Sequence, residues 1–154
     1  MIIERIFISQ EHNYFGHHGR EAGTAEVKEV EEAVMVAGKG IEGDRFFDWK
    51  ENYKGQITFF SREVYESLCV QLGVTGRGPE VFRRNVVVSG VDLNELAGQE
   101  FEVQGIRFEG VAECSPCYWM DEAFHPGAEA SLKGRGGLRA RILTSGTLRR
   151  EARR

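Results

Sequence analysis

Apolar and polar residues alternate along much of the chain, and this pattern predicts a protein built mainly from short β-strands. Segment 1–9, rich in isoleucine and phenylalanine, predicts a first strand. Segment 25–37 alternates valine with lysine and glutamate until the pattern slips at Glu31 and Glu32, which indicates a bulge or a turn. The polar, glycine-containing segment 12–24 predicts a loop between these strands.

One segment carries a helical period instead. Apolar residues recur at helical spacing between residues 64 and 72, Ser61 stands where an N-cap is expected, and Gly73 stands where the helix should end. Pro79 is suited to the first turn of a second, short helix that reaches residue 82. We therefore expect few helices, with the longest near the middle of the chain.

The remaining elements are short. Further strands are predicted at 56–60, 85–89, 101–103, 106–112 and 138–144, with another short strand after the last, a helix at 117–124, turns at 92–97 and 129–133, and a glycine-punctuated loop at 38–43. Many short strands and few helices predict a mainly β fold with short helices, an α+β protein, closed or nearly closed into a barrel because closure removes strand edges. No repeat or linker interrupts the pattern, so residues 1–154 should form one domain.

Composition places the chain among ordinary globular proteins. It has 154 residues, a hydrophobic fraction of 41%, a charged fraction of 29% and a formal net charge of -4, which argues against general nucleic-acid binding. Residues 149–154 hold four arginines and are expected to form a solvated, frayed tail. No signal peptide or membrane-spanning run is evident, and three cysteines fit a reducing compartment, so a cytoplasmic location without membrane contact is expected.

The first motif with chemical potential is Gly43-Asp44-Arg45, at the end of a glycine-rich loop. The planar guanidinium of Arg45 suits bidentate contact with phosphate, and Asp44 can orient it or accept a hydrogen bond from a heterocycle. A surface turn with an incidental ion pair is the alternative.

The second motif, Phe82-Arg83-Arg84-Asn85, stands between a predicted helix and a predicted strand. Adjacent arginines at such a boundary should point in different directions, one to solvent and one to the interior. Asn85 opens the strand, where its amide can cap the main chain or bind a ligand.

The third motif, Cys114-Ser115-Pro116-Cys117, follows a predicted strand and precedes a predicted helix. Pro116 should leave Cys117 at or near the first helical residue, where the helix dipole favours a thiolate. Four interpretations stay open: a dithiol redox pair, a single functional thiolate at Cys117, two packed cysteines, or half of a zinc site. The further zinc ligands would have to come from His12, His17, His18, His125 or Cys69, at no recognised spacing. Cys69 itself is better explained as a packing residue of the predicted helix.

Two loops offer weaker signals. His17-His18 lies in a polar, aromatic loop that could line a substrate entrance and supply a proton. Segment 134–139 is rich in glycine and arginine but fits neither the P-loop nor the dinucleotide motif. Its N–H groups could still contact a phosphate.

The ordered set of motifs resembles the MOSC domain, the C-terminal domain of molybdenum cofactor sulfurases. The resemblance runs from about residue 2 to 148 and rests on the segments 40–45, 83–90, 96–98, 115–117 and 138–143. It implies a β-barrel-like fold that binds the molybdenum cofactor, molybdopterin. Cys117 matches the cysteine that ligates molybdenum in related proteins, and Arg45, Arg83 and Asn85 match positions that hold the cofactor. Asp44 and Ser115 stand beside these positions and are expected to take part in binding.

The resemblance also implies a reaction. Relatives reduce N-hydroxylated substrates such as hydroxylamines, amidoximes and N-hydroxylated bases, and this chain would need separate electron-transfer proteins as donors. His17 or His18 is the expected proton donor at such a site. The family association also includes pyridoxal phosphate binding. Two departures from the family pattern, the extra thiol of Cys114 and the missing histidine after Arg45, keep a second class open, a sulfur or cofactor carrier without turnover.

Overall fold

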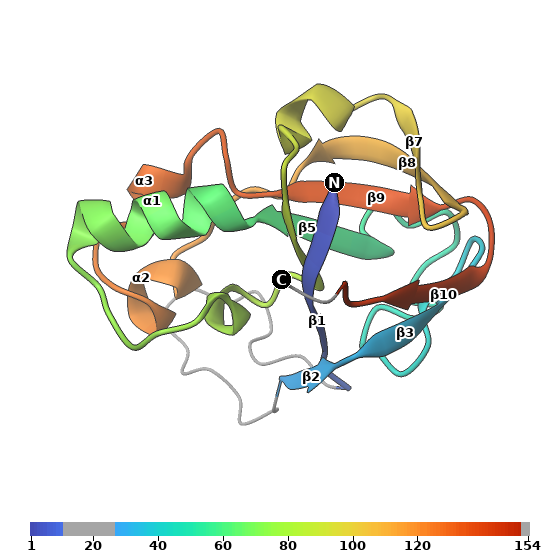
Figure 1. Cartoon of the computed structure of the whole chain (residues 1–154), viewed down its shortest axis with the longest axis horizontal. Helices are drawn as coiled ribbons and strands as arrows, with labels where there is room; N and C mark the ends of the chain where they lie inside the picture. Colours follow the sequence, from blue (N-terminus) through green and yellow to red (C-terminus); the bar gives the residue numbers. More distant parts are fainter. Residues whose placement is uncertain (11–26, 152–154) are drawn as a thin grey trace.

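The computed structural model describes residues 1–10 and 27–151, which fold mainly into strands with helices gathered to one side (Figure 1). The expected loop at 12–24, with His17 and His18, lies outside the described residues. The strands are β1 (Ile2–Ile8), β2 (Lys28–Val30), β3 (Glu32–Val36), β4 (Gly40–Ile41), β5 (Ile57–Ser61), β6 (Val86–Ser89), β7 (Glu100–Val103), β8 (Ile106–Glu113), β9 (Leu138–Ile142) and β10 (Gly146–Arg149).

These strands form two sheets. The larger one has seven strands in the order β2-β1-β6-β5-β9-β8-β7, and the smaller has three in the order β10-β3-β4. β5 and β6 run parallel, and the other paired strands run antiparallel. The expected mainly β architecture with short helices is confirmed. The expectation of a closed barrel is wrong for the described residues, because no strand pairing joins the two sheets and both keep free edges.

The break between the sheets lies where the alternation of the sequence slips. β2 pairs with β1 in the larger sheet, whereas β3 pairs with β10 and β4 in the smaller one. Glu31, between β2 and β3, is a bend, and its carbonyl accepts a hydrogen bond from Arg150 N at 2.8 Å. The slip at Glu31 therefore marks a change of sheet, and the smaller sheet covers the core instead of extending the larger sheet around it.

Two hydrophobic cores lie on the two faces of β5, because successive side chains of a strand point to opposite faces. Phe59 packs into the sheet core, which fills the space between the two sheets, and Phe60 packs into the helical core, which lies under the helices. Burial on both faces explains why every residue of β5 is buried. The sheet core consists of Ile3, Ile6, Ala33, Met35, Ile41, Ile57, Phe59, Val86, Val88, Leu93, Val103, Ile106, Phe108, Leu138, Ala140, Ile142 and Leu148. The helical core consists of Phe60, Leu68, Val74, Phe82, Met120, Phe124, Ala128 and Leu132.

The helices follow the local signals of the sequence, with one exception. α1 (Arg62–Leu72) begins after Ser61, whose Oγ accepts from Val64 N at 3.2 Å, and it ends at Gly73 as predicted. The 3₁₀ helices η1 (Pro79–Phe82) and η2 (Leu93–Leu96) and the helix α3 (Ala128–Leu132) also lie within or near their predicted ranges. The exception is α2 (Trp119–Ala123), which begins later than predicted. Among the described residues, no helix is long and apolar enough to cross a membrane.

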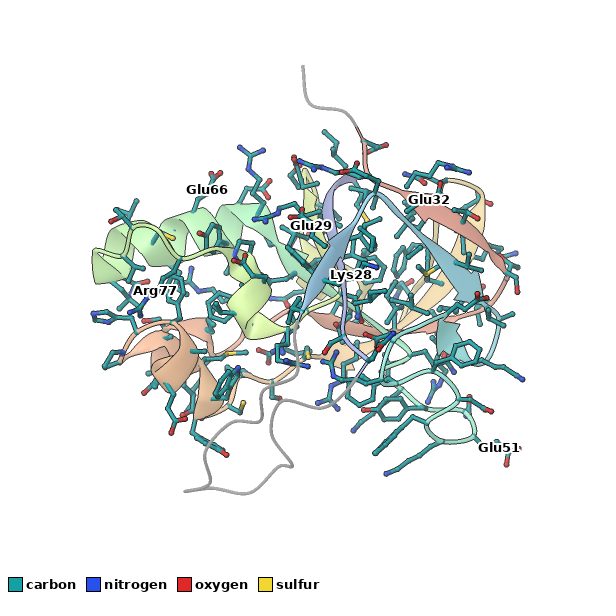
Figure 2. The ribbon with its side chains drawn as sticks, turned by 90° about the horizontal axis from the view of Figure 1, so that it is seen from below. Lys28, Glu29, Glu32, Glu51, Glu66 and Arg77 are labelled. Atoms are coloured by element: carbon teal, nitrogen blue, oxygen red, sulfur yellow. The ribbon has the colours of Figure 1, made fainter. Side chains whose placement is uncertain are left out.

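Charged side chains hold the outer strands and the end of the chain in place. Figure 2 shows Lys28 and Glu29 on β2, between Glu66 on the helical side and Glu32 on the smaller sheet. The carboxylate of Glu29 accepts two hydrogen bonds from Arg5 on β1, each 2.9 Å long. The hydrogen bonds from Arg5 are the main reason that the pKa of Glu29 is lowered. Part of the basic tail, expected to be frayed, is fastened to β1: Glu151 accepts from Ile3 N at 2.7 Å and donates its own N–H to the Ile3 carbonyl.

Candidate functional site

Ser9, just after β1, joins the first two motifs. Its N–H donates to Asp44 Oδ1 at 3.0 Å, its carbonyl accepts from Arg45 N at 2.7 Å, and its Oγ accepts from Arg83 Nη2 at 2.7 Å. We call this group of Ser9, Asp44, Arg45 and Arg83 the arginine side. Ser9 was not singled out by the sequence analysis, and its only local signal is a hydroxyl at the end of an apolar strand.

The carboxylate of Asp44 orients the arginine side from within. Its side chain is fully buried, and it accepts from Arg45 Nη1 at 3.3 Å and from Phe46 N at 3.3 Å. Arg45 also donates from Nη2 to the Arg83 carbonyl at 3.3 Å, and its Cζ lies 4.7 Å above the Phe46 ring. Asp44 therefore holds Arg45 through a buried contact, which argues against an incidental surface pair, and its contact with a ligand stays a prediction.

Arg83 and Arg84 point in different directions, as predicted, because of the main chain between η1 and β6, but neither extends freely into solvent. Arg83 has a φ of +59°, in the left-handed region that residues other than glycine seldom adopt. Its side chain is 7% exposed and turns inward to Ser9. Arg84 is half-buried and turns toward the cysteine motif on the other side.

Asn85 bonds within the protein through both ends of its amide. Its Oδ1 accepts from Thr58 N and Thr58 Oγ1, both at 3.0 Å, and its Nδ2 donates to the Phe7 carbonyl at 3.3 Å. The residue is 3% exposed. These contacts fasten the start of β6 to β1 and β5, which is a structural role beside the predicted cofactor contact.

The cysteine motif lies in the loop between β8 and α2. Cys114 is 5% exposed, Cys117 is half-buried and Ser115 is exposed, and none of the three described cysteines forms a disulfide. Cys117 lies near the start of α2, as expected, but not at its first residue, because Tyr118 is the N-cap and α2 starts at Trp119. The carbonyl of Cys117 accepts from Met120 N at 3.0 Å, so Cys117 begins the turn that leads into this five-residue helix.

Arg84 connects the second motif to the third. Its Nη2 donates to the carbonyls of Cys114 at 3.1 Å and Ser115 at 3.4 Å, and its Nε donates to the Gly136 carbonyl at 3.0 Å. We call Arg84, Gly136 and the segment 114–117 the cysteine side. The arginine side and the cysteine side therefore meet at the adjacent residues Arg83 and Arg84. Hydrogen bonds thus join segments of all three motifs through Arg83 and Arg84, although the sequence assigned Arg84 no role in the site.

The glycine-basic loop before β9 serves close packing. A Cβ on Gly136 would lie 2.3 Å from the Cys114 carbonyl oxygen, and one on Gly137, whose φ is +112°, would lie 2.4 Å from the Phe59 carbonyl oxygen. The N–H of Gly136 donates to Glu113 Oε2 at 3.1 Å. These glycines let the loop lie directly against the cysteine motif, a role that the search for phosphate-binding motifs did not consider.

The expected metal chemistry depends on Cys117. Within residues 1–10 and 27–151, no three His, Cys, Asp or Glu side chains gather in a way that could hold a bare metal ion. The histidines proposed as proton donors, His17 and His18, lie outside the described residues, as does His12 of the zinc hypothesis.

Comparisons with known proteins agree with the fold. A family model of the MOSC domain matches residues 15–152, and no curated protein matches the chain in sequence. The YuaD protein of Bacillus subtilis is 19% identical with a TM-score of 0.67, over 96% of this chain and 94% of that chain. YiiM of Geobacillus stearothermophilus is 14% identical with a TM-score of 0.67, over 96% and 70%.

YiiM of Escherichia coli is 17% identical with a TM-score of 0.62. The match covers 94% of this chain and 65% of that one, so the chain spans about two thirds of this neighbour. At such identities the structural likeness shows a shared fold. The structures therefore bear out the fold expected from the motifs, and the family match extends over most of the chain.

Proposed function

The chain belongs to the MOSC domain family, and we propose that it binds the molybdenum cofactor with which this family is associated, where its arginine and cysteine sides meet. The observation that carries the proposal is the contact of three motifs, distant in sequence, around Arg83 and Arg84. The family match gives no support to the expected pyridoxal phosphate binding, which stays an untested expectation.

The chemistry of the residues present fits such a cofactor. Molybdopterin has an anionic phosphate, a hydrogen-bonding pterin and a metal held by sulfur. The guanidinium groups of Arg45 and Arg83 are held by Asp44 and Ser9, and such fixed forks suit a phosphate. The exposed Ser115 and the half-buried Cys117 belong to the cysteine side, where Cys117 would supply one sulfur ligand.

Each of these residues has a defined task in this proposal. Ser9 and Asp44 hold the two guanidinium groups before any ligand arrives, which lowers the cost of ordering them on binding. Asn85 keeps the start of β6 against β5, so Arg83 stays in register with the other groups. When bound, the cofactor would supply a metal able to exchange two electrons with a substrate.

We further propose that the loaded protein reduces N-hydroxylated substrates, with electrons from separate electron-transfer proteins. What supports this step is the family membership together with the single half-buried thiol at the proposed metal position. Cleavage of the N–O bond takes up two electrons and two protons and releases water, and His17 or His18 remains the proposed proton donor.

Metal and pterin analysis tests the binding step. The protein is made in a host that synthesises the cofactor, and molybdenum and pterin are measured per polypeptide. We expect both in the wild type, both in Cys114→Ser, and a loss of molybdenum in Cys117→Ser. A wild type that holds neither group under these conditions contradicts the proposal, and loss of metal from Cys114→Ser alone reverses the ligand assignment.

An activity assay then tests the reduction step. Hydroxylamine and an amidoxime are offered to the loaded protein with a chemically reduced viologen as electron donor. We expect substrate-dependent oxidation of the viologen by the wild type and none by Cys117→Ser. If loaded protein reduces neither substrate, the carrier function becomes the better explanation.

A further inference from the structure

Arg84 has an unusual set of partners for a half-buried arginine. Its guanidinium donates to four main-chain carbonyl oxygens, those of Phe82, Cys114, Ser115 and Gly136, at 3.0 to 3.4 Å. Within the described part of the chain it forms no ion pair with a carboxylate. Arginine has five N–H donors, so most of them are used inside the protein and few are left for a ligand.

These bonds hold two loops together. The main chain of Cys114 is held at both its N–H and its carbonyl. The N–H donates to the Gly137 carbonyl at 2.8 Å, and the carbonyl accepts from Arg84. Gly136 packs so closely on the Cys114 carbonyl that no side chain would fit between them. The start of the cysteine motif is thus fixed, and Cys114 is buried while Cys117, three residues on, is half-buried.

We propose that Arg84 is a positioning residue that clamps the cysteine loop to the glycine loop, so that Cys114 stays enclosed and Cys117 is the thiol presented to the site. The functional meaning of this selection rests on the proposed role of Cys117 as the metal ligand. The clamp itself is a property of the protein without cofactor. It also explains how two thiols in one short motif take different roles.

The planar fork of arginine matters for this task as much as its charge. The bonded carbonyls lie on three separate segments, namely the end of η1, the cysteine loop and the glycine loop. A lysine ammonium is a compact charge on a flexible stem and would satisfy only part of this set. A methionine keeps much of the stem but donates no hydrogen bond.

Site-resolved alkylation of the cofactor-free protein tests the clamp. Native protein at a fixed neutral pH is treated with iodoacetamide, and the labelled fraction of Cys69, Cys114 and Cys117 is followed by peptide mass spectrometry. For Arg84→Met we expect Cys114 to react about tenfold faster than in the wild type, the effect of losing roughly one charge-assisted hydrogen bond. Arg84→Lys should show a smaller increase. Cys69, half-buried on α1, reports global opening and should change by less than about twofold.

Arg135→Met is the matched control. Arg135 is also half-buried and lies on the same glycine loop, but it donates to Ser131 and Gln71 and to no residue of the cysteine motif. We expect wild-type labelling of Cys114 in this variant. Unchanged Cys114 labelling in both Arg84 variants overturns the clamp, and so does equal acceleration of all three thiols, which would make Arg84 a residue of general stability.

The result is independent of the proposed function. If Cys114 is labelled faster in the Arg84 variants but the wild type never holds molybdenum, the labelling supports the clamp and the metal analysis contradicts cofactor binding. Unchanged labelling in a protein that does hold molybdenum would do the reverse.

Discussion

The arginine side and the cysteine side meet at neighbouring residues but are built in different ways. On the arginine side, buried side chains bond to one another and to the main chain, with Asp44 fully enclosed and Arg83 only 7% exposed. On the cysteine side, one arginine side chain binds main-chain carbonyls of two loops. The first lies at the end of β1 and the start of β6, and the second is formed by the loops that follow β8 and precede β9.

The two sides should therefore respond differently to mutation, one through the stability of the whole domain and the other through the local order of its loops. Changes on the arginine side break a buried polar network and should lower the free energy of unfolding of the whole domain. Changes on the cysteine side release loops whose polar groups water can reach, so they should alter thiol exposure more than global stability. The predictions below test this division.

Asn85→Ala should have the largest effect on stability. It removes three hydrogen bonds and leaves the buried Thr58 N–H and Phe7 carbonyl without their partner. We expect the free energy of unfolding to fall by roughly 3–4 kcal/mol, measured by urea denaturation. Asn94→Ala is the control, because Asn94 donates to the Gly134 carbonyl at an exposed position and should cost less than about 1 kcal/mol. Equal losses in the two variants would contradict a buried network at Asn85.

Gly137→Ala should come next, and it tests the border between the two sides. The added methyl group would lie 2.4 Å from the Phe59 carbonyl oxygen, at a φ of +112°. Strain and displacement of β9 from β5 should cost about 2–3 kcal/mol in the same measurement. Gly134→Ala has a positive φ but open space around its Cβ, so it should cost only about 1 kcal/mol. If Gly137→Ala lowers the free energy of unfolding no more than Gly134→Ala does, β9 can move away from β5 at this point at little cost.

The sequence predicts features that depend on neighbouring residues better than contacts between residues far apart in the chain. The helix from Arg62 to Leu72 was predicted with its ends because its caps, Ser61 and Gly73, are local signals. The short strands β7 and β8 were predicted at 101–103 and 106–112, also from local alternation. Local signals therefore located most strands and the longest helix.

Contacts between distant segments could not be predicted in this way. The open arrangement of two sheets depends on which strands β2 and β3 each pair with, and an alternation pattern does not name a partner. The clamp joins Arg84 to residues 30 and 52 positions away, and no local spacing encodes it. The start of α2 was misplaced because a proline suited to the first helical turn also fits an extended loop.

Arg45→Ala tests whether the arginine side serves a ligand in addition to the fold. If Arg45 contacts the cofactor phosphate, its loss should weaken cofactor retention by about 1.5–2 kcal/mol, the value of one charged hydrogen bond. Pterin content after dialysis measures this effect, with Arg141→Ala as the control, since that arginine pairs with Glu109 on the larger sheet. Equal pterin content in both variants and the wild type would confine Arg45 to a structural role.

The smallest expected effect lies in the helical core and concerns pH. Burial, together with a hydrogen bond to Cys69, raises the pKa of Tyr65 to about 12, above its ordinary value of 10.0. Between these two values the unfolded chain releases the phenolic proton while the folded chain keeps it, so the free energy of unfolding should fall as the pH rises through this window. The fall should stay below about 1.4 kcal/mol, the worth of one pKa unit, because solvent partly screens this half-buried ring. Tyr65→Phe has no such proton, so its stability should decline less steeply with pH than that of the wild type in parallel urea titrations. Equal slopes for the two proteins would show that Tyr65 ionises as readily in the folded chain as in the unfolded one, so that the helical core does not shield its hydroxyl from water.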